Sequence, residues 1–307
     1  MKKSLLYICF VVFGSLSCFS QQEKMFTQYL NYPTSINPAY AGSRGTLQLF
    51  GLARRQWVGI DGAPKSFVFS MNTPLHPFKL GTGLSLERDE LGPEQNTKVG
   101  VDLSYQLQVA REVYLNFGIK ADLAFYKANL SGSRTVDQGD PLLQQDIRGE
   151  FLPNFGVGAY LYGQRFFVGL SVPAMFKTSL DVNSNTSERI AYEEAHYYLM
   201  GGYLFDLNLV LKLKPSFLVK AVPGAPLSYD LTSMLIFYDR LWLGAAYRNE
   251  DAIAAIVQCN VTNQFRIGYA YDFGTSSLSG RSKGSHEISL SYDLTFNSRK
   301  LKSPRYF

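Results

Sequence analysis

Residues 98–109, KVGVDLSYQLQV, and 113–126, VYLNFGIKADLAFY, are two long runs in which apolar and polar residues alternate. A period of two places the two sets of side chains on opposite faces of a pleated strand. Only residues 110–112 separate the runs, so they predict an antiparallel hairpin with strands longer than the usual five or so residues. One face is wholly apolar, and the other carries charged residues, namely Lys98, Asp102, Lys120 and Asp122.

Two kinds of protein contain such a hairpin. In the wall of a membrane barrel the apolar face contacts lipid and the polar face lines a wet interior. In a large soluble β-sandwich or a lipocalin-like barrel the polar face is the outer one. The hairpin by itself leaves both interpretations open.

The N-terminus predicts export. Lys2 and Lys3 precede an apolar run, residues 5–13, and small residues at Cys18 and Ser20 place a cleavage site before residue 21. This order is typical of a secretory signal peptide, and its apolar core is too short to cross a bilayer as a helix. We therefore expect residues 1–20 to be removed. Acylation of Cys18 is an alternative, although the preceding residues lack a well-placed lipobox leucine.

The composition of the mature chain excludes several classes of function. Loss of the signal leaves Cys259 as the last cysteine, so neither an intramolecular disulfide nor a thiolate metal site can form. The formal charge of +5 falls by two with Lys2 and Lys3, which is too small an excess to indicate nucleic-acid binding. The one long apolar segment is the signal itself, which excludes a helical membrane protein. We expect no cofactor and no metal.

The alternation continues along most of the mature chain and predicts fourteen strands. They span residues 46–56, 64–73, 79–88, 97–109, 113–126, 151–162, 165–173, 195–206, 209–221, 226–237, 240–248, 252–261, 264–273 and 285–296.

The connections between these strands favour the membrane barrel. Counted from the N-terminus, the even-numbered links are mostly short, as at 110–112, 163–164 and 238–239. The odd-numbered links are generally longer, as at 89–96, 127–150, 174–194 and 274–284. Outer-membrane barrels have this asymmetry, with the short turns in the periplasm. The sequence thus predicts an all-β, antiparallel up-and-down transmembrane β-barrel in the outer membrane, with both termini periplasmic.

Residues 21–45 do not follow the strand pattern. Pro33 and Pro38 interrupt them, and Asn-Pro favours a turn. Their aromatic content argues against a flexible leader. We expect an irregular N-terminal periplasmic segment that acts as a plug or cap for the barrel of residues 46–296. Residues 297–307 would form a C-terminal periplasmic tail.

No arrangement of residues indicates catalysis, so the chain is not expected to be an enzyme. The three histidines lack metal-ligand spacing, and residues 169–173 miss the GxSxG nucleophile elbow at its last position. The charges on the polar faces are expected to pair across the lumen. An alternative is that Lys212, Lys214 and Lys220 form a basic stripe for an anionic guest.

Several motifs together resemble the PorP/SprF family of outer-membrane proteins, which belong to the Bacteroidetes type IX secretion and gliding machinery. The N-terminal matches are Phe26–Leu30, Ile36–Gly42 and Arg55–Ser66. Later matches are Leu91–Pro93 with Asn96, Tyr126–Leu130, Pro153–Gly156, Val168–Pro173 and Ser303–Phe307.

This resemblance implies a non-enzymatic component that binds, anchors or helps to export a secreted surface protein with a C-terminal targeting domain. It also implies contacts with other type IX components, among them a periplasmic peptidoglycan-associated protein. The alternative is a transport channel for a small or hydrophobic solute. The resemblance selects candidate partner-binding residues, namely Gln28, Tyr29, Asn37, Pro38, Ala39, Tyr40, Gly42, Gln56, Trp57, Gly59, Asp61, Gly62 and Pro64.

Overall fold

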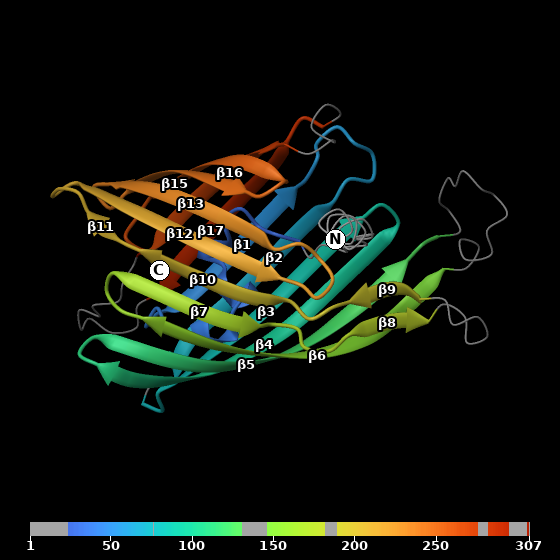
Figure 1. Cartoon of the computed structure of the whole chain (residues 1–307), viewed down its shortest axis with the longest axis horizontal. Coiled ribbons are helices and arrows are strands. Elements are labelled where there is room, and N and C mark those ends of the chain that lie inside the picture. The colour runs from blue at the N-terminus through green and yellow to red at the C-terminus, as the bar shows by residue number, and fades with distance from the viewer. Residues whose placement is uncertain are drawn as a thin grey trace, which may run out of the picture.

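The computed structural model describes residues 24–75, 77–130, 146–181, 189–275, 282–294 and 306. The expected signal peptide lies outside these residues, as does the expected tail apart from Tyr306. Within the described part, antiparallel strands close into a fourteen-stranded barrel, which confirms the predicted fold (Figure 1). None of the helical turns described is long and apolar enough to cross a membrane.

The wall strands follow one another in chain order. They are β1 (Leu47–Arg55), β2 (Lys65–Leu75), β3 (Leu80–Leu91), β4 (Glu94–Ala110), β5 (Val113–Ala128), β6 (Ile147–Tyr162), β7 (Phe166–Val172), β10 (Tyr197–Tyr203), β12 (Leu211–Ala221), β13 (Ser228–Phe237), β14 (Leu241–Arg248), β15 (Ala252–Asn260), β16 (Phe265–Gly274) and β17 (Ser285–Leu294). Three short strands are added to them, β8 (Thr178–Asp181), β9 (Arg189–Glu193) and β11 (Phe205–Asp206).

The first and last strands of the barrel pair with each other. Leu47 of β1 lies opposite Leu294 of β17, so the wall begins and ends at the same rim. Every wall strand has two antiparallel neighbours, because β10 pairs with both β7 and β12. Closure leaves no open sheet edge running through the membrane, where unpaired backbone groups cost several kcal/mol each.

The hairpin of residues 98–126 forms β4 and β5 with the orientation predicted for a membrane wall. Val99 and Val101 are about half exposed on the outer face, at 50% and 47%. Asp102 and Lys120 are Cα partners on the inner face and are both buried. The apolar face therefore contacts lipid and the polar face lines the interior.

Several predicted boundaries are wrong, and one of them is the start of β6, which lies at Ile147 instead of residue 151. The link expected at 89–96 is a turn on Gly92 and Pro93, because β3 and β4 stay paired as far as Leu91 and Glu94. Alternation does not mark these strand ends, since polar residues occupy both faces there. The strand expected at 195–206 divides into β10 and β11, and the link expected at 174–194 contains the separate hairpin of β8 and β9.

The two rims of the barrel differ. The short-turn rim carries the links 76–79, 111–112, 163–165, 238–240 and 261–264, and also the longer link 204–210, which contains β11. The long-link rim carries 56–64, 129–146, 173–196, 222–227 and 275–284, with the brief turns at 92–93 and 249–251 as exceptions. Because outer-membrane barrels keep short turns in the periplasm, the long-link rim is the one expected to face the cell exterior.

Candidate functional site

Residues 24–45, here called the inner segment, lie inside the barrel and contact its wall on several sides (Figure 1). Tyr29, Tyr32, Ala39 and Tyr40 are each at most 2% exposed. Tyr32 stacks on Phe50 of β1, with ring centroids 5.6 Å apart. The segment therefore forms part of the core of a barrel that would otherwise be hollow.

Three single turns of 3-10 helix shape the inner segment. They are η1 (Tyr29–Asn31), η2 (Pro33–Ser35) and η3 (Pro38–Tyr40). Proline is suited to the first position of a helical turn, where its fixed φ fits and its missing N–H is not needed. The Asn37 side chain accepts a hydrogen bond from the Ala39 N–H and donates one to the Ala159 carbonyl of β6. One side chain thus shapes the turn and attaches it to the wall.

Glycines on the inner face of the wall make room for the inner segment. A Cβ at Gly118 of β5 would overlap the backbone of Ala39, and one at Gly81 of β3 would overlap the carbonyl of Ala41. Gly42 is needed for a second reason, since its φ is +72° and its Cα region abuts β2 and β3. The backbone of the segment consequently seats directly on the backbone of the wall.

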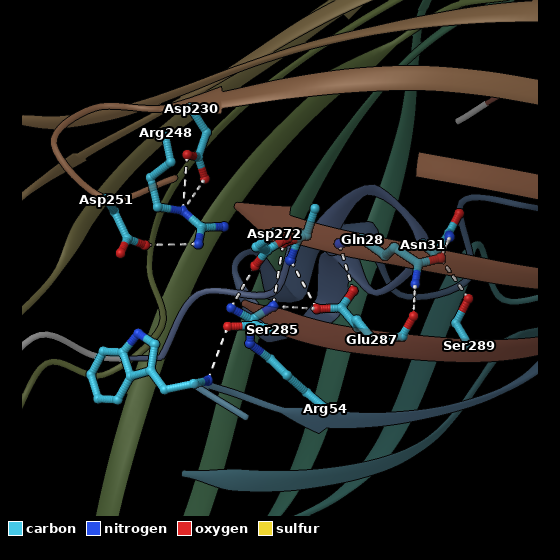
Figure 2. Close-up of polar contacts among 12 residues, drawn as sticks. Gln28, Asn31, Arg54, Asp230, Arg248, Asp251, Asp272, Ser285, Glu287 and Ser289 are labelled. Carbon is cyan, nitrogen blue, oxygen red and sulfur yellow. Dashed lines mark hydrogen bonds and ion pairs between the residues drawn. The ribbon is translucent and has the colours of Figure 1, made fainter. Parts of the chain in front are cut away.

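A buried ionic cluster holds the start of the inner segment (Figure 2). The Glu287 carboxylate of β17 accepts the backbone N–H groups of Thr27 and Gln28 at 3.0 and 2.8 Å. Arg54 of β1 pairs with Glu287 at 3.1 Å and with Asp272 of β16 at 2.7 Å. The Thr27 hydroxyl donates to Asp272 at 2.7 Å. Because the two carboxylates share a single arginine, they keep lone pairs that can accept hydrogen bonds from the segment. The cluster therefore binds the backbone of the segment.

Further polar contacts continue along the inner segment. Its backbone carbonyls accept hydrogen bonds from wall side chains, and its own side chains bond to wall carboxylates. The wall-to-segment bonds come from Ser171 to Ile36, Asn116 to Ala39 and Ser104 to Ala41, at 2.7–3.0 Å. The segment-to-wall bonds run from Tyr32 to Glu87 at 2.9 Å and from Arg44 to Asp293 at 3.2 Å.

Burial in the lumen keeps the Tyr32 hydroxyl protonated. Burial first, and then the nearby Glu87 carboxylate, raises the pKa of Tyr32 well above its usual value. The phenol remains a neutral donor to Glu87 over the physiological pH range. Ionisation of the phenol therefore does not break this hydrogen bond over that pH range.

The space beside the inner segment is small. A cavity of about 10 Å³ lies between Thr27 and Tyr29 of the segment and Asp230 and Arg248 of the wall. That is close to the roughly 10–15 Å³ that a single water molecule needs. The hydroxyl of Tyr29 is buried there without a hydrogen-bond partner in the described structure. The cavity suits a water molecule better than a transported solute.

The remaining candidate residues lie apart from the lumen, in the link 56–64 on the long-link rim. Val58 exchanges backbone hydrogen bonds with Gly284 and Lys283 of the link 275–284. Gly62 accepts one from Gly92 in the turn between β3 and β4. Trp57 has a φ of +48°, and its backbone N–H donates a hydrogen bond to the Ser285 hydroxyl. This rim platform, as we call residues 56–64, is therefore fixed by contacts to both of its neighbours.

The candidate residues thus form two groups rather than one. The lumen group comprises Gln28, Tyr29, Asn37, Pro38, Ala39, Tyr40 and Gly42, and the rim group comprises Gln56, Trp57, Gly59, Asp61, Gly62 and Pro64.

Sequence reasoning missed the wall residues that receive the inner segment. Arg54 blurred the alternation of its strand, and a buried charge inside that strand could have marked it as a binding residue. Two lysines of the basic stripe, Lys212 and Lys214, contact other residues of the chain. Lys212 pairs with Asp239 at 2.6 Å, and Lys214 bonds to the backbone of Tyr306, near the C-terminus.

The model of one family, described as type IX secretion system membrane protein PorP/SprF, matches residues 18–292. No sequence among curated proteins matches the chain. Many solved structures are similar in outline, including the following three. Omp33 of Acinetobacter baumannii is 8% identical, with a TM-score of 0.49 over 82% of this chain and 100% of that one. The monoaromatic hydrocarbon channel CymD is 10% identical, with a TM-score of 0.48 over 87% of this chain and 93% of that one. A Pseudomonas aeruginosa FadL homologue is 13% identical, with a TM-score of 0.43 over 81% of this chain and 89% of that one.

Proposed function

This chain belongs to the PorP/SprF family of type IX secretion system membrane proteins, and from that premise we propose that it docks a secreted cargo protein at the outer membrane rather than conducting a solute. The cargo is a surface protein with a C-terminal targeting domain. The long-link rim faces the cell exterior, and both termini are periplasmic. Residues 1–20 are the signal peptide, residues 21–45 act as a plug, and residues 297–307 form a periplasmic tail.

The observation that supports this proposal is the buried position of the inner segment, which is bonded to the inner face of the wall. The inner segment seats on wall glycines and is hydrogen-bonded to β4, β5, β6, β7 and β17. A barrel of fourteen strands without such a segment would enclose water or a ligand path. A filled barrel gives instead a rigid support for the loops above it, which is what a docking protein needs.

The rim platform is the surface that we propose for cargo contact. Trp57 is a partly exposed aromatic residue on a fixed backbone, and Asp61 is exposed beside it in the same link. Aromatic residues held rigidly contribute much of the binding energy of protein interfaces. A platform tied to its neighbours loses little conformational entropy when a partner binds.

Affinity capture from cells tests this proposal. The double variant Trp57→Ala with Asp61→Ala should lose co-purified type IX cargo after gentle crosslinking. The matched control, Arg111→Ala with Arg240→Ala, changes two exposed residues of the short-turn rim and should keep it. Equal capture of cargo by both variants would contradict the assignment of the platform. Absence of any type IX component from the wild-type capture would contradict the docking function itself.

The second candidate function, a solute channel, has a different electrical signature. In planar bilayers we expect the wild-type protein to be silent, because the inner segment fills the lumen. A large and steady single-channel conductance of the wild-type protein would favour the channel over the docking function.

A further inference from the structure

Three basic residues lie side by side on the outer face of the wall, at the long-link rim. Arg55 of β1 is the Cα partner of Lys65 on β2 and of His286 on β17. The inward neighbours Arg54 and Glu287 are buried, so the alternation directs Arg55 and His286 outward. Arg55 and Lys65 are exposed. We call Arg55, Lys65 and His286 the outer basic patch.

Among the described residues, the two exposed cations of the outer basic patch, Arg55 and Lys65, form no ion pair. Like charges directly opposite each other on adjacent strands are destabilising. The nearest cross-strand carboxylate, Glu90 opposite Lys65, already accepts two hydrogen bonds from Arg88, at 2.9 and 3.1 Å. An anion from outside the chain would relieve this repulsion.

The surroundings of the patch indicate what kind of anion that is. Directly below it, toward the middle of the wall, the outer face carries Phe67 at 50% exposure and Ile288 at 52%. Beside it, Tyr269 shares a hydrogen bond of 2.7 Å with the His286 ring, and Tyr271 packs against the same ring. Aromatic residues of this kind mark the interface between hydrocarbon and headgroups in outer-membrane barrels. The patch therefore lies at headgroup level.

Elsewhere on the described strands, the outer face at this level carries single cations, such as Lys127 on β5, or none. At the corresponding ends of β13, β14 and β15 the outward residues are Tyr229, Tyr247 and Ile253. A general attraction to a negative membrane surface would spread cations around the rim. A cluster on three adjacent strands indicates one localised ligand.

We propose that the outer basic patch binds the phosphate of a lipid headgroup in the outer leaflet. The Arg55 guanidinium can bind phosphate oxygens in the bidentate manner typical of arginine, and the Lys65 ammonium adds a second charge. The acyl chains of the same lipid lie against Phe67 and Ile288. This site is independent of the proposed cargo docking.

Native mass spectrometry of the full mature protein tests the proposal, with two lipid probes. One probe is diphosphorylated lipid A, and the other is lipid A from which both phosphates have been removed. The patch variant is Arg55→Gln with Lys65→Gln. The control variant, Arg111→Gln with Arg240→Gln, removes the same charge from the short-turn rim. Heat-modifiable gel mobility checks that each barrel is folded, and Arg55→Gln alone replaces the double variant if the latter fails to fold.

We expect the patch variant to retain about tenfold less diphosphorylated lipid A than the wild type and the control. All three proteins should retain the phosphate-free lipid equally. Equal retention of the phosphorylated probe by the patch and control variants would overturn the proposal. So would an equal loss of both probes, or displacement of the lipid by millimolar inorganic phosphate, which would indicate a site for the free ion.

Discussion

At the scale of single residues, the wall fits the inner segment in two ways. Glycines leave room for its backbone, and side chains bond to it. Gly118 and Gly81 leave out the Cβ atoms that would overlap Ala39 and Ala41. Glu287 supplies acceptors where the segment offers two backbone donors. Neither feature is visible in hydrophobic periodicity. Each feature can be tested by a substitution of its own.

Gly118→Ala should displace the inner segment from the wall. The added methyl group would overlap the Ala39 backbone, which cannot move as a flexible side chain does. Overpacking of this kind costs about 1–3 kcal/mol. We expect trypsin to cleave at Arg44, which is buried in the wild type. The control is Gly51→Ala, whose added Cβ would meet only the Val68 carbonyl oxygen at 4.0 Å. Resistance of Arg44 in both variants would contradict the close fit.

Glu287→Gln should lower the thermal stability of the folded protein. Breaking a buried ion pair costs about 3–5 kcal/mol, and we expect the lower end because Asp272 still contacts Arg54. The matched control, Glu90→Gln, breaks an exposed pair with Arg88 and should cost at most about 1 kcal/mol. The measurement is the temperature at which the heat-modifiable band is lost. Equal shifts in the two variants would show that the buried cluster does not hold the fold.

At the scale of elements, sequence periodicity predicted most of the wall, because lipid outside and polar groups inside impose a period of two. The strands expected at 113–126, 240–248 and 252–261 differ from the observed ones by at most two residues at either end. The prediction failed beyond the part of the wall where lipid lies outside and polar groups lie inside. Strands β3 and β4 continue beyond the apolar belt, and the hairpin of β8 and β9 lies outside the barrel sheet. Contacts of the inner segment depend on residues far apart in the chain, which one sequence does not reveal.

The part of the link 173–196 that contains β8 and β9, here called the excursion, should be dispensable for the stability of the barrel. These two strands pair only with each other in the described structure. Replacing residues 178–193 with a short Gly-Ser link should therefore change the stability of the barrel by no more than about 0.5 kcal/mol, as expected for a surface change. Urea unfolding in detergent gives the measurement. A loss of several kcal/mol would mean that the excursion supports the wall.

The inner segment should behave as a separable element. Removal of residues 24–44 takes no strand from the sheet, and it opens the space now filled by Tyr32 and Tyr40. The shortened protein should conduct ions in planar bilayers, where we expect the wild type to be silent. A synthetic peptide of residues 24–44, added afterwards, should reduce that conductance, whereas a peptide of the same composition in scrambled order should not. Persistent silence of a correctly folded deletion variant would contradict a segment that closes the lumen.

At the scale of the whole molecule, the binding site for the inner segment is assembled from both ends of the chain. Thr27 and Gln28 bind Glu287, about 260 residues away, while Ala39 and Ala41 bind β5 and β4. The acceptors on β17 reach their positions only when β1 and β17 pair and close the barrel. The cost in entropy of such distant contacts delays them in folding.

We therefore expect the barrel to close before the inner segment docks. During refolding into detergent, the heat-resistant band of the barrel should appear first, and protection of Arg44 from a brief pulse of trypsin should follow. Arg44 is a direct reporter because its partner, Asp293, lies at the end of β17 beside the closing pair of strands. Gly118→Ala should leave the first step unchanged and abolish the second, since it affects only the seat of the segment. Protection of Arg44 before heat resistance would instead mean that the segment nucleates the barrel, because the wall would then form around a segment that is already in place.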